Sequence, residues 1–263
     1  MARGLSEDAV AARREAEAAE ARAGAEPQPS AAPAAVEEGR RARPCEAGKR
    51  DGMGRLTFDA PPTGCADFRP NLSPREMLER GMHGGVYFHP KGGKQGVKYP
   101  YAKHPNGIPG VGVEEFPEAW FAGIPERLYR SRTYSVANNM YKVKSGLDPA
   151  AWETNGWINA VDPRGWTQWY FRFFEGRRLK GGEDERQISR WRGVCGAKGR
   201  WKRNLLNKIV KTAASRGVDP HTLLDDASIS PVVRQTLLHW AYEVSAVDLD
   251  AHLKEGAPAG PYG

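Results

Sequence analysis

The chain has 263 residues, enough for one ordinary domain with a substantial core, and 40% of them are hydrophobic. Its three cysteines, Cys45, Cys65 and Cys195, are too few and too far apart for a disulfide framework, so we expect an intracellular protein, nuclear or cytoplasmic. No apolar run approaches the roughly 18 residues of a membrane span, and we expect no membrane partner.

The positive charge is concentrated in one part of the sequence. Between Asp162 and Arg216, fifteen Lys and Arg residues stand against five Asp and Glu residues. This balance of +10 exceeds the net +7 of the whole chain, so the rest of the sequence is slightly acidic. Such a cluster attracts anionic partners, of which nucleic acid (DNA or RNA) is the leading class and another polyanion the next.

The sequence predicts a disordered tail over residues 1–57. Its Ala, Glu and Arg residues favour helix, but the tract has no apolar face to bury. Its Ala and Arg content leaves organelle targeting open, although acidic residues such as Glu7 and Glu15 argue against a transit peptide. We expect one folded domain over 58–250 and a frayed C-terminus over 251–263.

Capping signals place the first helix directly after Ser73. Pro74 suits the first helical position, Glu76 completes a capping box, and Gly81 ends the helix. The segment 82–113 that follows is rich in glycine. We expect a helical turn at 117–121.

Short strands are candidates within the glycine-rich segment at 86–88 and 97–99. Its GMHGG pattern (81–85) lacks the lysine and hydroxyl of a P-loop. Its backbone amides are an alternative anion site, with Lys91, Lys94 and Lys98 nearby. We favour a structural Ω-type loop over that alternative.

The second half of the chain is predicted to be helical. Asp148-Pro149 and Asp162-Pro163 each open a helix, the first ending at 155–156 and the second near Arg178. Periodicity predicts further helices over 184–195, 198–216 and 230–240. The fold class is therefore mainly α, with a basic, aromatic part at 160–217.

Seven of the eight tryptophans lie in this second half and Trp120 lies shortly before it, so a packed core must form there. We expect Trp166, Trp169, Phe173 and Trp191 to belong to it.

The helix expected over 198–216 has one continuous polar arc without an acidic residue. The arc consists of Arg200, Arg203, Asn204, Asn207, Lys208 and Lys211. An ordinary solvated face mixes charge signs, because opposite pairs one turn apart stabilise a helix and like pairs destabilise it. Arg and Lys suit phosphate contacts, and Asn can also contact a base edge. We therefore predict the principal phosphate-binding surface here; a basic face that meets an acidic protein is the alternative.

A second group of arginines precedes this helix and extends the predicted phosphate track: Arg177, Arg178, Arg186 and Arg190. Arginine binds phosphate bidentately and stacks on aromatic rings. An acidic run at 183–185 lies beside the group, so internal ion pairs are the alternative.

No catalytic residue or cofactor is assigned from the sequence. Three histidines, His83, His89 and His104, lie in the glycine-rich segment, but their spacing matches no zinc pattern and we expect no metal site. His239 is expected to be packed within its helix, and Cys195 to belong to the core.

Four strings in the sequence resemble a family of uncharacterised open reading frames of fungi, algae, bacteria and their viruses. They are SPREMLERGMHGGVYF (73–88), DPRGWTQWYFRFFEGRR (162–178), DERQISRW (184–191) and SPVVRQTLLHWAYE (230–243). The resemblance covers roughly residues 67–245 and implies a single domain. The family has no established activity, so the resemblance implies no site residue.

Three functional hypotheses follow from these patterns. The leading one is a nucleic-acid-binding protein that contacts phosphates through a basic helical surface, without strong sequence preference. The second is an enzyme acting on a nucleotide or nucleic-acid base, which a deep pocket joining Tyr87, Lys98 and the 177–190 region would favour. The third is a scaffold protein that docks an acidic partner.

Overall fold

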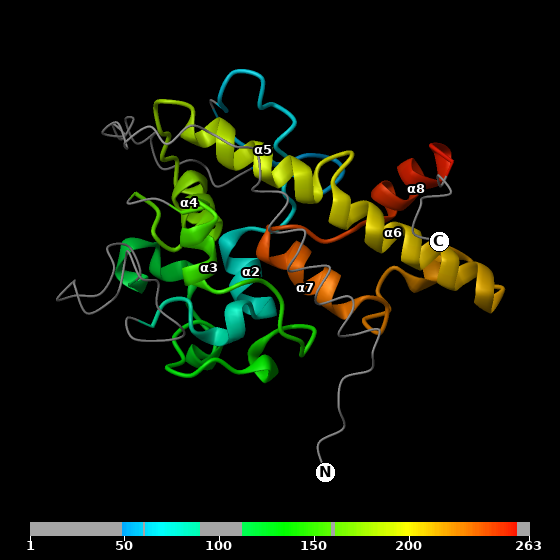
Figure 1. Cartoon of the computed structure of the whole chain (residues 1–263), viewed down its shortest axis with the longest axis horizontal. Coiled ribbons are helices and arrows are strands. Elements are labelled where there is room, and N and C mark those ends of the chain that lie inside the picture. The colour runs from blue at the N-terminus through cyan, green and yellow to red at the C-terminus, as the bar shows by residue number, and fades with distance from the viewer. Residues whose placement is uncertain (1–48, 60, 90–111, 159–160, 257–263) are drawn as a thin grey trace, which may run out of the picture.

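The computed structural model describes residues 49–59, 61–89, 112–158 and 161–256, and helices dominate them (Figure 1). The α-helices are α2 (Pro74–Arg80), α3 (Pro149–Thr154), α4 (Trp166–Phe174), α5 (Glu183–Cys195), α6 (Arg200–Arg216), α7 (Pro231–His239) and α8 (Ala246–Lys254). Single 3-10 turns lie between them: η1 (His83–Gly85), η3 (Val113–Glu115), η4 (Glu118–Trp120), η5 (Glu126–Leu128), η6 (Val136–Asn138) and η7 (Pro220–Leu223). The mainly α fold is confirmed.

One small hairpin precedes the helices. Strands β1 (Lys49–Arg50) and β2 (Leu56–Thr57) pair antiparallel, and Leu56 is only 2% exposed. Residues 49–57, which the composition placed in the tail, therefore belong to the folded part. The remainder of the expected tail, 1–48, lies outside the described residues.

The predicted capping box of α2 is confirmed. The Ser73 hydroxyl accepts from the Glu76 backbone N–H at 3.3 Å, and the Glu76 carboxylate accepts from the Ser73 backbone N–H at 2.7 Å. Met77 and Leu78 on this helix are fully buried. The expected helical turn near 117–121 and the helix after Asp148 are also present, as η4 and α3.

Two expectations about local structure are wrong. Residues 86–88 form a turn rather than a strand, because the preceding η1 turn holds Gly84 and Gly85 at φ of 62° and 83°. Helix α4 starts after Gly165 and ends at Phe174, so Asp162 is not its cap. The candidate strand at 97–99 lies outside the described residues.

Among the described residues, one α-helix is not predicted by the sequence patterns above. Helix α8 begins at a second capping box, in which Ser245 accepts from Asp248 N–H and Asp248 accepts from Ser245 N–H. Leu249 on α8 is fully buried. The helix continues into the segment expected to fray, 251–263, of which residues 257–263 lie outside the described part.

The core is built around α4. Trp169, Tyr170, Phe171 and Phe173 on this helix are fully buried, and Trp191 of α5 is 2% exposed. Helix α6 lies at the periphery, where it packs on α5, α7, η7 and α8 (Figure 1). The predicted core tryptophans are confirmed, and Cys195 is buried among them.

Candidate functional site

The polar arc of α6 lies opposite the buried side of that helix. Trp201, Leu205, Ile209 and Ala213 are buried against the neighbouring helices. At 100° per residue, the centre of the arc lies about half a turn from the centre of this buried stripe. Four arc residues are exposed: Arg200, Asn204, Lys208 and Lys211. The other two, Arg203 and Asn207, are half-buried.

The charges of α6 run against its own dipole. The first turn holds Arg200, Lys202 and Arg203 and no acidic residue, although the amino end of a helix favours negative charge. Helix α5 has the expected arrangement, with three acidic residues in its first turn. The basic residues in the first turn of α6 therefore lie where helix stability alone would not place them.

The arc keeps its charge within the described part of the chain. The ion pairs that α6 forms there are Lys202 with Asp248 and Arg216 with Asp226, and neither cation belongs to the arc. The guanidinium of Arg200 lies 5.5 Å from the centre of the Trp201 ring. These contacts leave the arc as a positively charged surface that faces outward.

One arc residue, Arg203, also lines a cavity of about 360 Å³ between α6, α8 and the β1–β2 segment. Lys202 lines the same cavity, and its ammonium lies 3.4 Å from a carboxylate oxygen of Asp248. That carboxylate also accepts from Arg55 at 3.0 Å and from Tyr242 at 2.7 Å. The positive charges of Lys202 and Arg55 in this cavity are therefore partly neutralised by Asp248, whereas those of the arc are not.

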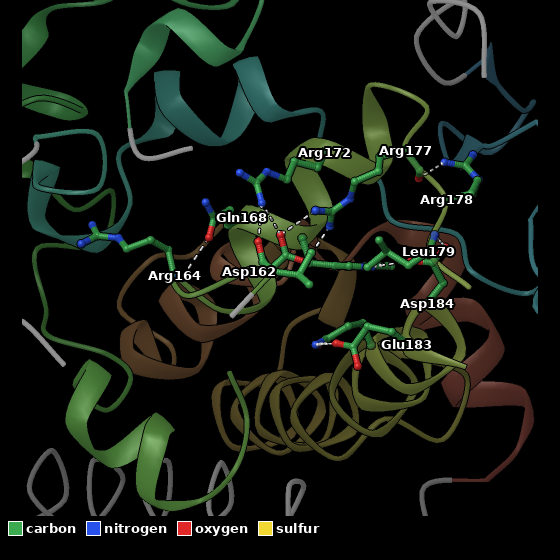
Figure 2. A network of polar contacts seen from close by, with 12 residues as sticks. Asp162, Arg164, Gln168, Arg172, Arg177, Arg178, Leu179, Glu183 and Asp184 are labelled. Atoms are coloured by element: carbon green, nitrogen blue, oxygen red, sulfur yellow. Dashed lines mark hydrogen bonds and ion pairs between the residues drawn. The ribbon is translucent and has the colours of Figure 1, made fainter. Parts of the chain in front are cut away.

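The second arginine group is largely engaged inside the protein. Arg177 is 5% exposed and binds Asp162 bidentately, at 2.9 and 2.6 Å, as Figure 2 shows. Arg172 binds the same carboxylate at 3.0 Å and also binds Glu115 bidentately. This buried network anchors the start of α4 to its end, which favours a structural role for Arg177.

The other members of this group also have internal partners. Arg178 donates to the backbone oxygens of Phe173 and Asp59 and lies 3.7 Å from the centre of the Phe173 ring. Arg186 pairs with Glu183 at 2.8 Å. The alternative of ion pairs with the acidic run 183–185 is confirmed for Arg186, whereas Arg177 pairs with Asp162 instead.

Two adjacent cavities with shared lining residues, together called the two-chamber pocket, lie between η1, α3 and the amino end of α4. Chamber one measures about 250 Å³ and chamber two about 50 Å³. Five residues line both chambers: His83, Ser145, Gly146, Trp152 and Arg164. Tyr87, Tyr134, Lys144 and Asp148 are among those that line only chamber one, and Trp157, Arg190, His239 and Trp240 are among those that line only chamber two.

Arg190, the last member of the second group, belongs to this pocket. Its guanidinium lies 5.5 Å from the Trp157 ring centre and 5.3 Å from the Trp240 ring centre. It also donates to the Trp157 backbone oxygen at 3.1 Å and to Gln187 at 2.9 Å. Tyr87 and Arg190 therefore line two adjacent chambers that share five residues. Lys98 lies outside the described residues.

Three aromatic side chains are stacked beside the pocket. The His83 ring lies 4.1 Å from the His239 ring and 5.1 Å from the Tyr87 ring, nearly parallel to both. His239 Nε2 accepts from the His83 backbone N–H at 3.3 Å, and the His83 Nε2 atom is 3.1 Å from the Thr167 hydroxyl. His239 is packed within its helix as predicted.

Burial keeps both imidazoles neutral. It lowers the pKa of His239 to about 3 and lowers the pKa of His83 well below its usual range, where the neighbouring His239 adds to the effect. Burial also lowers the pKa of Arg164 to about 10, although this guanidinium lies 5.0 Å from the Tyr87 ring centre and donates to the Tyr87 backbone oxygen at 2.7 Å. The pocket therefore joins two uncharged bases to a buried cation.

No pattern in the sequence connects the residues of this pocket. His83 lies in the glycine-rich segment, Trp152 in the helix after Asp148, and Arg164 in the basic segment. They are far apart in the chain, and no spacing in the sequence indicates that they meet. Among the described residues, no group of three or more His, Cys, Asp or Glu side chains is arranged to hold a metal ion.

No family model, curated protein or solved structure matches this chain. Among the described residues, no helix is long and apolar enough to cross a membrane.

Proposed function

We propose that the protein binds nucleic acid through the arc of α6, with contacts to phosphates that are largely independent of sequence. The observation that carries this proposal is the outward, acid-free arc on a helix whose own dipole disfavours cations at its amino end. Arg200, Arg203, Lys208 and Lys211 supply the phosphate contacts, while Asn204 and Asn207 add neutral hydrogen bonds.

The arc suits phosphates better than a single anion. Its four cations are distributed over three turns of helix rather than gathered around one point. A row of separated cations fits the repeated charges of a nucleic-acid backbone, and this kind of contact carries no sequence information. The scaffold hypothesis remains as an outcome of the test, since an acidic protein surface presents a similar row of charges.

Charge reversal tests the proposal. The double variant Arg203→Glu with Lys211→Glu should weaken binding of a labelled 20-nucleotide DNA roughly tenfold or more, equally for unrelated sequences, in fluorescence anisotropy at low salt. The matched control is Arg130→Glu with Arg132→Glu, which changes the net charge by the same amount at two exposed arginines outside α6. This control should bind nearly as tightly as the parent.

Two results would count against the proposal. Equal losses in both double variants would mean that only net charge matters. Undetectable DNA binding by the parent chain at low salt would remove the nucleic-acid assignment and leave an acidic protein as the partner of the arc.

A further inference from the structure

The two-chamber pocket shares no lining residue with the arc of α6, so it calls for a ligand of its own. Its size limits that ligand to one planar ring system. An apolar cavity of about 150 Å³ admits a benzene molecule, so 250 Å³ in chamber one holds a ring somewhat larger than benzene. The 50 Å³ of chamber two admits a group of one or two atoms that projects from such a ring.

The walls of chamber one suit a flat ring. Tyr87, Tyr134 and Trp152 line it together with the neutral His83 ring. Trp152 is half-buried and lines both chambers, so one of its surfaces is available to a ligand. Stacking on aromatic side chains is the usual way in which proteins hold nucleobases, and it accepts every base.

One residue that lines chamber two, Trp157, has a buried donor without an acceptor among the described residues. The Trp157 indole is 3% exposed, and its Nε1–H makes no hydrogen bond to any described residue. Other buried indoles behave differently: Trp166 donates to the Gln187 backbone oxygen at 3.2 Å, and Trp191 donates to the Trp240 backbone oxygen at 3.0 Å. A buried polar group of this kind calls for a partner, and an acceptor atom on a ligand supplies one.

The remaining polar groups define the edge of the ligand. Arg164, which lines both chambers, is a second buried donor, whereas the Asp148 carboxylate in chamber one is an acceptor. The Trp157 N–H calls for an acceptor, and a ring carbonyl next to a ring N–H supplies one. That edge occurs in guanine, hypoxanthine, uracil and thymine, and adenine lacks it.

Backbone strain at the pocket agrees with a binding role. His83 has a φ of 49°, in the left-handed region that non-glycine residues rarely adopt. Strained residues cluster at ligand sites, where the surrounding structure must hold them in place. The His239 ring accepts from the backbone N–H of His83, and the Thr167 hydroxyl lies beside the ring nitrogen of His83, so both contacts hold His83 in place.

We infer that this pocket binds a single carbonyl-bearing nucleobase, stacked against Trp152, with its carbonyl oxygen accepting from Trp157 Nε1–H. The exposed Lys144 at the margin of chamber one lies where a 5′-phosphate or a strand would leave the pocket. The same chemistry comes from a free nucleoside or from an unpaired base within a strand.

Inosine and adenosine test the inference, because they have the same size and differ only at one edge: inosine has a carbonyl beside a ring N–H, and adenosine has an amino group beside an unprotonated ring nitrogen. In calorimetric titration of the full chain, inosine should bind roughly tenfold or more tighter than adenosine, since the amino group would leave the indole donor unpaired. Trp157→Phe keeps a ring but removes the N–H, so it should erase this difference without orphaning any partner. Trp120→Phe, at a tryptophan that lines neither chamber, should preserve the difference.

A second variant tests the stacking wall. Trp152→Leu should weaken both nucleosides, by roughly tenfold for the stacking that is lost. Inosine that binds no tighter than adenosine, or an unchanged preference in Trp157→Phe, would overturn the inference.

Oligonucleotides distinguish the two sources of the base. An octamer of deoxyadenosine is compared with the same octamer carrying one deoxyinosine. If the octamer with deoxyinosine binds tighter and Trp157→Phe removes the difference, the ligand is an unpaired base in a strand. If only the free nucleosides show the preference for inosine, the ligand is a small molecule.

The Arg203→Glu, Lys211→Glu variant separates this inference from the proposed function. It should lose affinity for both octamers and keep its affinity for inosine. Loss of inosine preference with intact octamer binding refutes the pocket alone. Intact inosine preference without octamer binding by the parent chain refutes the α6 interface alone.

Discussion

The protonation of individual histidines in this protein is set by burial as much as by neighbouring charges. His83 and His239 are stacked in the interior, and their pKa values are lowered because the charged form would lose its hydration. His221 is the opposite case: it is exposed, and hydrogen bonds to Asp219 and Asp250 raise its pKa. The two buried histidines therefore oppose protonation of the folded state.

This arrangement predicts acid sensitivity. Unfolded imidazoles take up protons as the pH falls through about 6.5, while the folded pair does not, so stability present at neutral pH is lost on acidification. Each buried histidine should contribute about 1.4 kcal/mol, the equivalent of one pH unit below the pKa of the unfolded imidazole. The free energy of unfolding should therefore fall by about 3 kcal/mol between pH 7.5 and 5.5. Urea denaturation at both pH values measures the change.

His239→Gln keeps an acceptor for the His83 N–H and should remove about half of this fall. His221→Gln should remove none of it, since the raised pKa of His221 acts in the opposite direction. An unchanged pH dependence in His239→Gln would assign the acid sensitivity to other groups.

Among the elements, the η1 turn depends most strictly on its residue types. A Cβ on Gly84 would lie 2.3 Å from the Tyr134 ring, and one on Gly85 would lie 2.0 Å from the Arg127 backbone oxygen. The Gly84 N–H also donates to Asn139 at 2.7 Å. The two glycines thus let the 127–139 segment pack directly on η1 and form one wall of the pocket.

Gly84→Ala should destabilise the protein by about 3 kcal/mol or more, because backbone strain and overpacking add together. The matched change Gly123→Ala should cost only about 1 to 2 kcal/mol, since Gly123 has a similar φ of 77° but no atom within 4 Å of its added Cβ. Chemical denaturation of both variants measures the difference. Equal losses of stability in the two variants would show that Tyr134 can move away from the added Cβ at no cost in free energy.

At the scale of the whole molecule, the basic segment separates into two parts with different surroundings. The early arginines are largely bound to internal carboxylates and backbone oxygens, as Figure 2 shows for Arg172 and Arg177. The arc of α6 faces outward, and its helix contains no acidic residue. The charge that reaches a partner is therefore smaller than the sequence balance of +10 indicates.

The proposed interface has four cations, which sets an expected salt dependence. A plot of log affinity for duplex DNA against log salt should have a slope of about −3.6, for four phosphates neutralised. Lys208→Ala should reduce the slope by about one, and Arg132→Ala, outside α6, should leave it unchanged. A slope near zero in the parent chain would contradict phosphate binding by the arc.

The sequence by itself determined most of the helices, the core tryptophans and the polar arc, but not α8 or the bounds of α4. Their signals are local: the Ser73 capping box, the four-residue spacing from Trp201 to Ala213, and the acid-free run over 200–216 depend on neighbours along the chain. Only the tertiary structure decided which cations are engaged internally, because Asp162 and Glu115 reach Arg172 from other parts of the chain. It also decided the pocket, which brings together His83, Trp157 and His239 through long-range packing that no sequence period records.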